Sequence, residues 1–148
     1  MTRDVLIPTV GNAGAGDQMV HPLKPNYNNP IHAIFDNKGR CVLKFETKDG
    51  SVSNHPNSSC QFERKEISPK DTHISKIQVW HDRDFIRGFK FYSNNDVVLQ
   101  AGDFSDEMKE VQLEAGERLV GVKSRLYDNS PGNNTLHCNL VLVVGKLA

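Results

Sequence analysis

Phe85-Ile86-Arg87-Gly88-Phe89-Lys90 and Arg118-Leu119-Val120-Gly121-Val122-Lys123 are two stretches of this chain with a similar make-up. Each is a short apolar segment centred on a glycine. Both belong to the region from Ile74 to Leu142, where four short apolar segments alternate with turn residues. Short apolar segments bounded by Gly, Asn and Asp are typical of antiparallel β-sheet. The repetition predicts a fold assembled from similar β-units.

The same pattern extends in both directions along the chain. Residues 31–35 and 41–45 flank a turn composition at 36–39 and predict a β-hairpin. Further strands are predicted at residues 77–79, 86–92, 97–100 and 119–126, with a weaker one at 60–63. The cleanest alternation is in the last strand, at Leu136, Cys138, Leu140, Leu142 and Val144. Only Ser105–Glu110 has a helical composition, and it is long enough for one or two turns. The predicted class is all-β, an antiparallel Greek-key or sandwich domain.

The first 30 residues differ from the rest, because they hold four of the seven prolines and little periodicity. Proline lacks an N–H and favours extended conformations that pair poorly with one another. We therefore expect an extended N-terminal arm at residues 1–30, followed by a β domain at 31–148. Three states are open for the arm: a disordered tail, docking on the domain's own edge, or docking on a neighbouring subunit.

Composition excludes several classes of protein. The 148 residues carry 18 basic and 18 acidic side chains, so the net charge is zero and a nucleic-acid-binding surface is not expected. No stretch approaches the ~18 apolar residues of a membrane span. The first residues do not resemble a signal peptide, and the three cysteines are an odd, widely spaced set. We therefore expect a cytoplasmic protein with reduced thiols, which fits an intracellular or cytoskeletal assembly.

Reactive groups are scattered. His137 and Cys138 are adjacent on a predicted strand, so their side chains point to opposite faces. A zinc site at His55 and Cys60 would need two more ligands, such as Cys41 or His73, at a spacing that matches no established pattern. The sequence therefore predicts no transition-metal site.

Acidic residues are better explained by turns. The acidic side chains at 96, 103, 106 and 107 do not follow the EF-hand spacing, and Asp hydrogen-bonds its own backbone in turns. His81, Asp82 and Asp84 form a predicted hairpin tip, where general acid–base catalysis would need a further group that the sequence does not place. We therefore predict no catalytic residue, no metal and no cofactor, and a protein that is not an enzyme.

Three stretches carry a resemblance to a known family: Ile74-Ser-Lys-Ile-Gln-Val, Phe85-Ile-Arg-Gly-Phe-Lys-Phe-Tyr, and Val111-Gln-Leu-Glu-Ala-Gly-Glu-Arg-Leu-Val-Gly-Val. They are similar to the I-x-x-I-x-V, I-x-G-I/F-x-F-x-Y and L-x-x-G-E-x-I-x-x-V cores of the jacalin-like lectin domains. The resemblance covers roughly residues 74–122. It implies a β-prism made of three four-stranded Greek keys.

Sugar-binding members of that family hold the ligand with an N-terminal glycine-rich stretch and a late G-x-x-x-D loop. Gly11-Asn12-Ala13-Gly14-Ala15-Gly16-Asp17 is a loose match to the first. We find no counterpart of the second, because the chain ends at Ala148 directly after a predicted strand. No sugar-binding position is therefore carried over from the resemblance.

Two functions fit these observations. The first is a non-catalytic interaction module, a structural or accessory subunit of a larger protein assembly that contacts other subunits through its arm and its sheet edges. Its candidate partner-binding residues are Pro22, Pro25, Tyr27 and Trp80. The alternative is a carbohydrate-binding jacalin-like lectin that contacts glycans through polar loops. Its candidate ligand-binding residues are Asp82, Asp84, Tyr127, Asp128 and Asn129.

Overall fold

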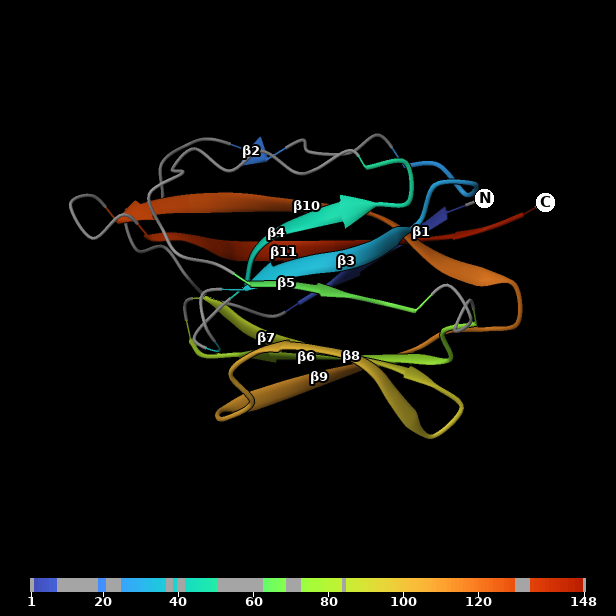
Figure 1. Ribbon diagram of the computed structural model, residues 1–148. Coiled ribbons are helices and arrows are strands. Elements are labelled where there is room, and N and C mark those ends of the chain that lie inside the picture. Colours follow the sequence, from blue (N-terminus) through green and yellow to red (C-terminus); the bar gives the residue numbers. More distant parts are fainter. Residues whose placement is uncertain are drawn as a thin grey trace.

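The computed structural model describes residues 2–7, 19–20, 25–36, 39, 42–50, 63–68, 73–83, 85–129 and 134–147. These residues form three antiparallel β-sheets and no helix, which confirms the all-β prediction. The three sheets surround a common interior (Figure 1). No part of the described chain is a helix long and apolar enough to cross a membrane.

Each sheet has its own strand order. The first sheet contains, in order, β1 (Thr2–Leu6), β11 (Asn134–Lys146), β10 (Glu117–Asn129) and β2 (Met19–Val20). The second contains β4 (Val42–Thr47), β3 (Ile31–Asp36) and β5 (Glu63–Glu66). The third contains β8 (Asp96–Gly102), β7 (Ile86–Ser93), β6 (Lys76–His81) and β9 (Glu107–Gln112). The two ends of the chain therefore share one sheet, and the middle of the chain supplies the other two.

The predicted alternation of apolar and polar residues places the core between the sheets. In β6, Ile77 and Val79 are fully buried, and Gln78 between them is only partly covered. The rings of Phe45 in β4 and Phe89 in β7 meet edge to face, with 5.5 Å between centroids, and join the second sheet to the third. Leu142 of β11 is equally buried and brings the first sheet into the same core. All three sheets thus stabilise one another through one interior.

The assembly has two distinct ends. At the hairpin end, where β3, β6, β8 and β10 end, the backbone N–H of Gly102 donates to the carboxylate of Asp36 at 2.9 Å. At the terminal end, where β9 ends and β10 begins, the Arg3 guanidinium donates to the carbonyl of Gln112 at 2.9 Å. Figure 1 shows the arrowheads of β3 and β10 at the left and both chain termini at the right. Sites at the two ends are therefore separated by the length of the strands.

One element was predicted wrongly. The segment 105–110, expected to be helical, lies largely in β9, which pairs antiparallel with β6 and sets Met108 opposite Trp80. Val111 is the one buried side chain of β9, so this is an edge strand with a polar exposed surface. Pairing with β6 overrides the local helical composition, as tertiary context often does. A strand was also expected at 60–63. Residues 60–62 lie outside the described residues, and the strand described here is β5, at Glu63–Glu66.

Residues 2–7, at the start of the predicted arm, belong to the first sheet. β1 pairs antiparallel with β11, and Val5 lies opposite Leu142. Ile7 is completely buried, and its N–H donates to the carbonyl of Leu140 at 2.8 Å. Met19–Val20 pairs in turn with β10. Of the three states left open for the arm, these described parts match docking on the domain's own sheet.

Arg3 of β1 forms a salt bridge with Glu117 at the start of β10. Its Nε and Nη2 each donate to one carboxylate oxygen of Glu117 at 2.9 Å. Glu117 is buried and also accepts the backbone N–H of Glu114 at 2.7 Å. The hydrogen bonds from Arg3 hold the pKa of Glu117 below its ordinary value of 4.5. Arg3 therefore offsets much of the cost of burying the ionised Glu117 carboxylate.

We expect Arg3→Ala to lower the free energy of unfolding by about 1–3 kcal/mol at pH 7, because a buried carboxylate loses its charged partner. The loss should shrink in acid. Since the pKa of Glu117 is lower in the folded than in the unfolded state, the stabilisation is complete above the unfolded value of 4.5 and disappears as the pH falls through the folded value. Urea denaturation of both proteins at pH 7 and pH 3 measures this, and an equal loss at both pH values would contradict it.

Candidate functional site

The β6–β7 hairpin at the hairpin end is closed by the carboxylate of Asp82. Its Oδ1 accepts the backbone N–H of Phe85 at 2.7 Å, and its Oδ2 accepts Nε of Arg87 at 2.7 Å. Nη2 of Arg87 lies 2.6 Å from the same Oδ2. Asp82 was predicted to bind ligand. The structure gives it a role in shaping the hairpin.

Tyr127, Asp128 and Asn129 end the long strand β10 and lie at the same end of the molecule as Asp82. Their backbones pair with β11, and Asp128 stands opposite Thr135. Their side chains, and Asp84 altogether, lie outside the described residues. The fold therefore brings the described members of the predicted ligand-binding set to one end of the molecule.

Asp36 is a residue at this end that the sequence analysis treated as part of a turn. It is the last residue of β3 and only 2% exposed. Its Oδ2 accepts the N–H of Gly102, whereas its Oδ1 is buried without a hydrogen-bond partner in the described part of the chain. A buried carboxylate oxygen is costly unless it is hydrogen-bonded. Through its hydrogen bond with Gly102, Asp36 connects the second sheet to the third at the hairpin end.

An aromatic cluster of Trp80, Phe104 and Lys90 lies on the outer face of the third sheet, next to the hairpin end. The rings of Trp80 and Phe104 are 5.0 Å apart and inclined at 66°. The Nζ of Lys90 lies 4.5 Å from the Phe104 centroid and 5.2 Å from that of Trp80. Trp80 of β6 lies opposite Gly88 of β7. Because glycine has no side chain, nothing from that position covers the Trp80 ring. The two half-buried rings thus form a partly open apolar surface.

A row of polar side chains continues from this cluster across the same outer face. The Tyr92 hydroxyl donates to the amide oxygen of Gln78 at 2.7 Å. The Gln78 amide nitrogen in turn donates to Glu110 at 3.0 Å, and Gln112 donates to the other oxygen of Glu110 at 2.8 Å. The hydrogen bonds from Gln78 and Gln112 lower the pKa of Glu110. This polar row presents oriented donors and acceptors beside two aromatic rings.

The sequence matches no family model, and no curated protein matches it either. Comparison with solved structures gives a different result. Artocarpin, complexed with methyl-α-mannose, superposes with a TM-score of 0.62 at 13% identity, over 97% of this chain and 98% of that chain. AcmJRL, a mannose-binding jacalin-related lectin from Ananas comosus, gives a TM-score of 0.60 at 13% identity, over 97% and 99% of the two chains. The chain has the jacalin-like β-prism fold.

A third comparison is with a much larger protein. The V. cholerae biofilm matrix protein Bap1 has a TM-score of 0.51 and 14% identity, and the match spans all of this chain but 22% of that one. At these identities the similarity concerns the fold alone. It nevertheless extends the resemblance seen at residues 74–122 to almost the whole length of the β-prism.

The predicted partner-binding residues have separate positions on the β-prism. The Arg118 guanidinium lies 4.7 Å above the ring of Tyr27 and donates to its carbonyl at 3.4 Å, so Tyr27 packs on the chain's own β10. Pro25 is exposed, and Pro22 lies outside the described residues. Trp80 belongs to the aromatic cluster. Their role in binding a partner protein stays a prediction.

The acidic residues considered for calcium are not brought together. Asp96 opens β8 and Asp103 follows its other end, so the length of a seven-residue strand separates them. The Asp103 carboxylate accepts the N–H and hydroxyl of Ser105, which lowers the pKa of Asp103. Within the described part of the β-prism, no three or more His, Cys, Asp or Glu side chains are grouped so that they could hold a metal ion. His55, Cys60 and Cys41 lie outside that part.

Proposed function

We propose that this protein binds carbohydrate, without catalysing a reaction, through the hairpin end of its β-prism. The observation that carries the proposal is the match over 97% of the chain to two lectin structures, one complexed with methyl-α-mannose and one described as mannose-binding. This favours the alternative reading of the sequence. The reading as a structural subunit rests on the residues alone, because no described contact or comparison supports a protein partner.

The chemistry at the hairpin end suits a sugar, which offers hydroxyl groups at its edges and C–H groups on its faces. Tyr127, Asp128 and Asn129 contribute a phenol, a carboxylate and an amide, which are the side-chain groups that hydrogen-bond hydroxyls. They are carried by β10, where their backbones pair with β11. We assign the direct contacts to these three residues. Asp82 is already engaged by Arg87, so we give it the role of holding the neighbouring hairpin in place.

The outer face of the third sheet offers an extension of this site. Aromatic rings offer a flat apolar surface that packs against the C–H face of a sugar, and their polar neighbours orient it. Trp80 and Phe104 provide such a surface close to the hairpin end, and Glu110 provides an acceptor further along the same face. A longer glycan would therefore run from the end of β10 towards the aromatic cluster.

Binding of the full chain to a broad glycan panel tests the proposal. We expect at least one mannose-containing or related glycan to bind, and Asp128→Ala to weaken that binding by at least about tenfold, since a hydrogen bond to a charged group contributes about 1.5–3 kcal/mol. Asp96→Ala is the matched control, because Asp96 is an exposed acidic residue that begins β8 at the terminal end. It should leave the affinity unchanged. No binding across the panel would contradict the proposal, and equal losses in both variants would contradict its location.

A further inference from the structure

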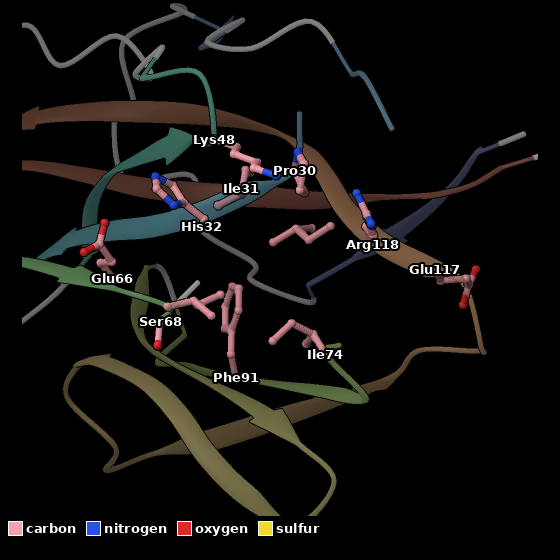
Figure 2. Close-up of a pocket in the computed structure, with 12 residues that line it drawn as sticks. Pro30, Ile31, His32, Lys48, Glu66, Ser68, Ile74, Phe91, Glu117 and Arg118 are labelled. Atoms are coloured by element: carbon pink, nitrogen blue, oxygen red, sulfur yellow. The ribbon is translucent and has the colours of Figure 1, made fainter. Parts of the chain in front are cut away.

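A pocket of about 280 Å³ opens at the terminal end of the β-prism, away from the hairpin end. Its residues come from all three sheets and from the segments that lead into them. Figure 2 shows Phe91 rising from β7 towards Pro30, Ile31 and Lys48, with Ile74 to one side and Arg118 above it. The pocket therefore lies where the three sheets meet, and no part of the proposed carbohydrate site lines it.

The walls of this pocket are apolar. They are formed by Ile31, Ile67, Ile74, Phe91 and Leu119, of which all but Ile74 are buried. An apolar cavity of about 150 Å³ accommodates benzene, so a pocket nearly twice that size has room for two fused rings or an alkyl chain of similar volume. Concave apolar sites with a few polar groups are the usual form of small-molecule pockets. An apolar ligand body fits these walls.

The acidic side chains at the rim are paired with arginines of the protein itself. Glu66 accepts a hydrogen bond from Arg64 at 2.9 Å. Glu117 is held by both donors of Arg3, and in Figure 2 its carboxylate points away from the pocket. Both carboxylates therefore have an arginine partner within the protein, and Arg64 is shared with Glu46.

The basic side chains at the rim are not compensated in this way. Lys48 is exposed, and the described part of the chain offers its ammonium group no carboxylate. Arg118 packs on the ring of Tyr27 and likewise forms no ion pair with a described residue. In Figure 2 both side chains lie on the same side of the pocket as Pro30. The rim therefore carries two positive charges above an apolar interior.

We propose that this pocket binds a small amphiphile with one anionic group. The apolar body, an alkyl chain or a pair of fused rings, lies between Phe91, Ile74 and Leu119. The anionic group meets Lys48 and Arg118. Such complementarity gives specificity for an anionic over a cationic ligand with the same body. This site is independent of carbohydrate binding.

Titration of the full chain with 1-anilinonaphthalene-8-sulfonate, an anionic fused-ring probe, tests the proposal by fluorescence. We expect saturable binding at one site and displacement of the probe by decanoate. Decyltrimethylammonium, which has the same chain length and the opposite charge, should displace it at least about tenfold more weakly. The proposal would be overturned by the absence of saturable binding, or by equal displacement by the two amphiphiles.

Two variants locate the site. Ile74→Trp places a larger side chain in the empty volume and should abolish probe binding. Lys48→Glu reverses an exposed charge that the fold does not use, and should weaken decanoate binding at least about tenfold, whereas Lys109→Glu, an exposed lysine of β9 outside the pocket, should have no effect. Unchanged decanoate affinity in Lys48→Glu would overturn the proposal even if Ile74→Trp failed to fold. Glycan binding should be unaffected in Lys48→Glu.

Discussion

Gly102→Ala is expected to unfold the protein or to lower its free energy of unfolding by more than about 4 kcal/mol, at the upper end of what single substitutions do. Gly102 has a φ of +87°, a conformation that disfavours any side chain. An added Cβ would lie 2.0 Å from the carbonyl oxygen of Arg87 and 2.8 Å from Cα of Gly88. These are backbone atoms of the adjacent strand and cannot rotate away. Strands β7 and β8 would have to separate locally, and the hydrogen bond from the Gly102 N–H to Asp36 would be lost.

Gly50→Ala is the matched control for this substitution. Gly50 has a φ of +89°, but an added Cβ would have no heavy atom within 4 Å. Its substitution should cost only the backbone strain of about 1–2 kcal/mol. Urea denaturation of both variants separates the two contributions, because they share the strain and differ in the overlap. Equal destabilisation would show that strands β7 and β8 do not approach each other at Gly102 as described.

Ile7→Ala is expected to lower the free energy of unfolding by about 2–5 kcal/mol, the usual range for truncating a fully buried isoleucine. Ile7 directly follows β1 and is 0% exposed within the core that the three sheets share. Its neighbour Leu6 is 62% exposed. Leu6→Ala should therefore change the free energy by no more than about 0.5 kcal/mol. Chemical denaturation of both variants provides the comparison.

The contrast between Ile7 and Leu6 separates two descriptions of the N-terminal segment. If residues 2–7 complete the first sheet, the two adjacent substitutions differ widely. If these residues were an arm that serves a neighbouring protein, both substitutions would leave the stability of the isolated chain unchanged. That second result would contradict the pairing of β1 with β11.

The strands that could be predicted are those whose sequence alternates between buried apolar and exposed polar residues. Ile77 and Val79 alternate with polar residues because the third sheet has one buried and one exposed face, so the sequence alone indicates β6. The stretch 105–110 has no such pattern, because β9 is an edge strand with one buried side chain. Its β-structure comes from β6, which is about 30 residues earlier in the chain. The sequence did not indicate β1 for the same reason. Its own side chains are mostly exposed, and the buried residue Ile7 follows the strand.

The candidate sites were predictable to a smaller extent. Asp82 and Arg87 are five residues apart at a hairpin tip, so the position of Asp82 at a loop end could be predicted, although its use as a partner of Arg87 was missed. The pairing of Trp80 with Phe104 joins two elements through sheet geometry that no local pattern reveals. The terminal-end pocket depends on residues from Pro30 to Leu119, which meet only after three sheets have packed.

Location of a bound sugar is the most direct test of the central claim that the hairpin end of this β-prism binds carbohydrate. The measurement is an amide chemical-shift titration of the isotope-labelled full chain with the glycan that binds best on the panel. The account predicts saturable shifts at residues 127–129 and 134–136 of the β10–β11 hairpin, and none at Arg118 and Leu119 at the opposite end. Shifts confined to the terminal end, or no shifts with any glycan, would contradict it.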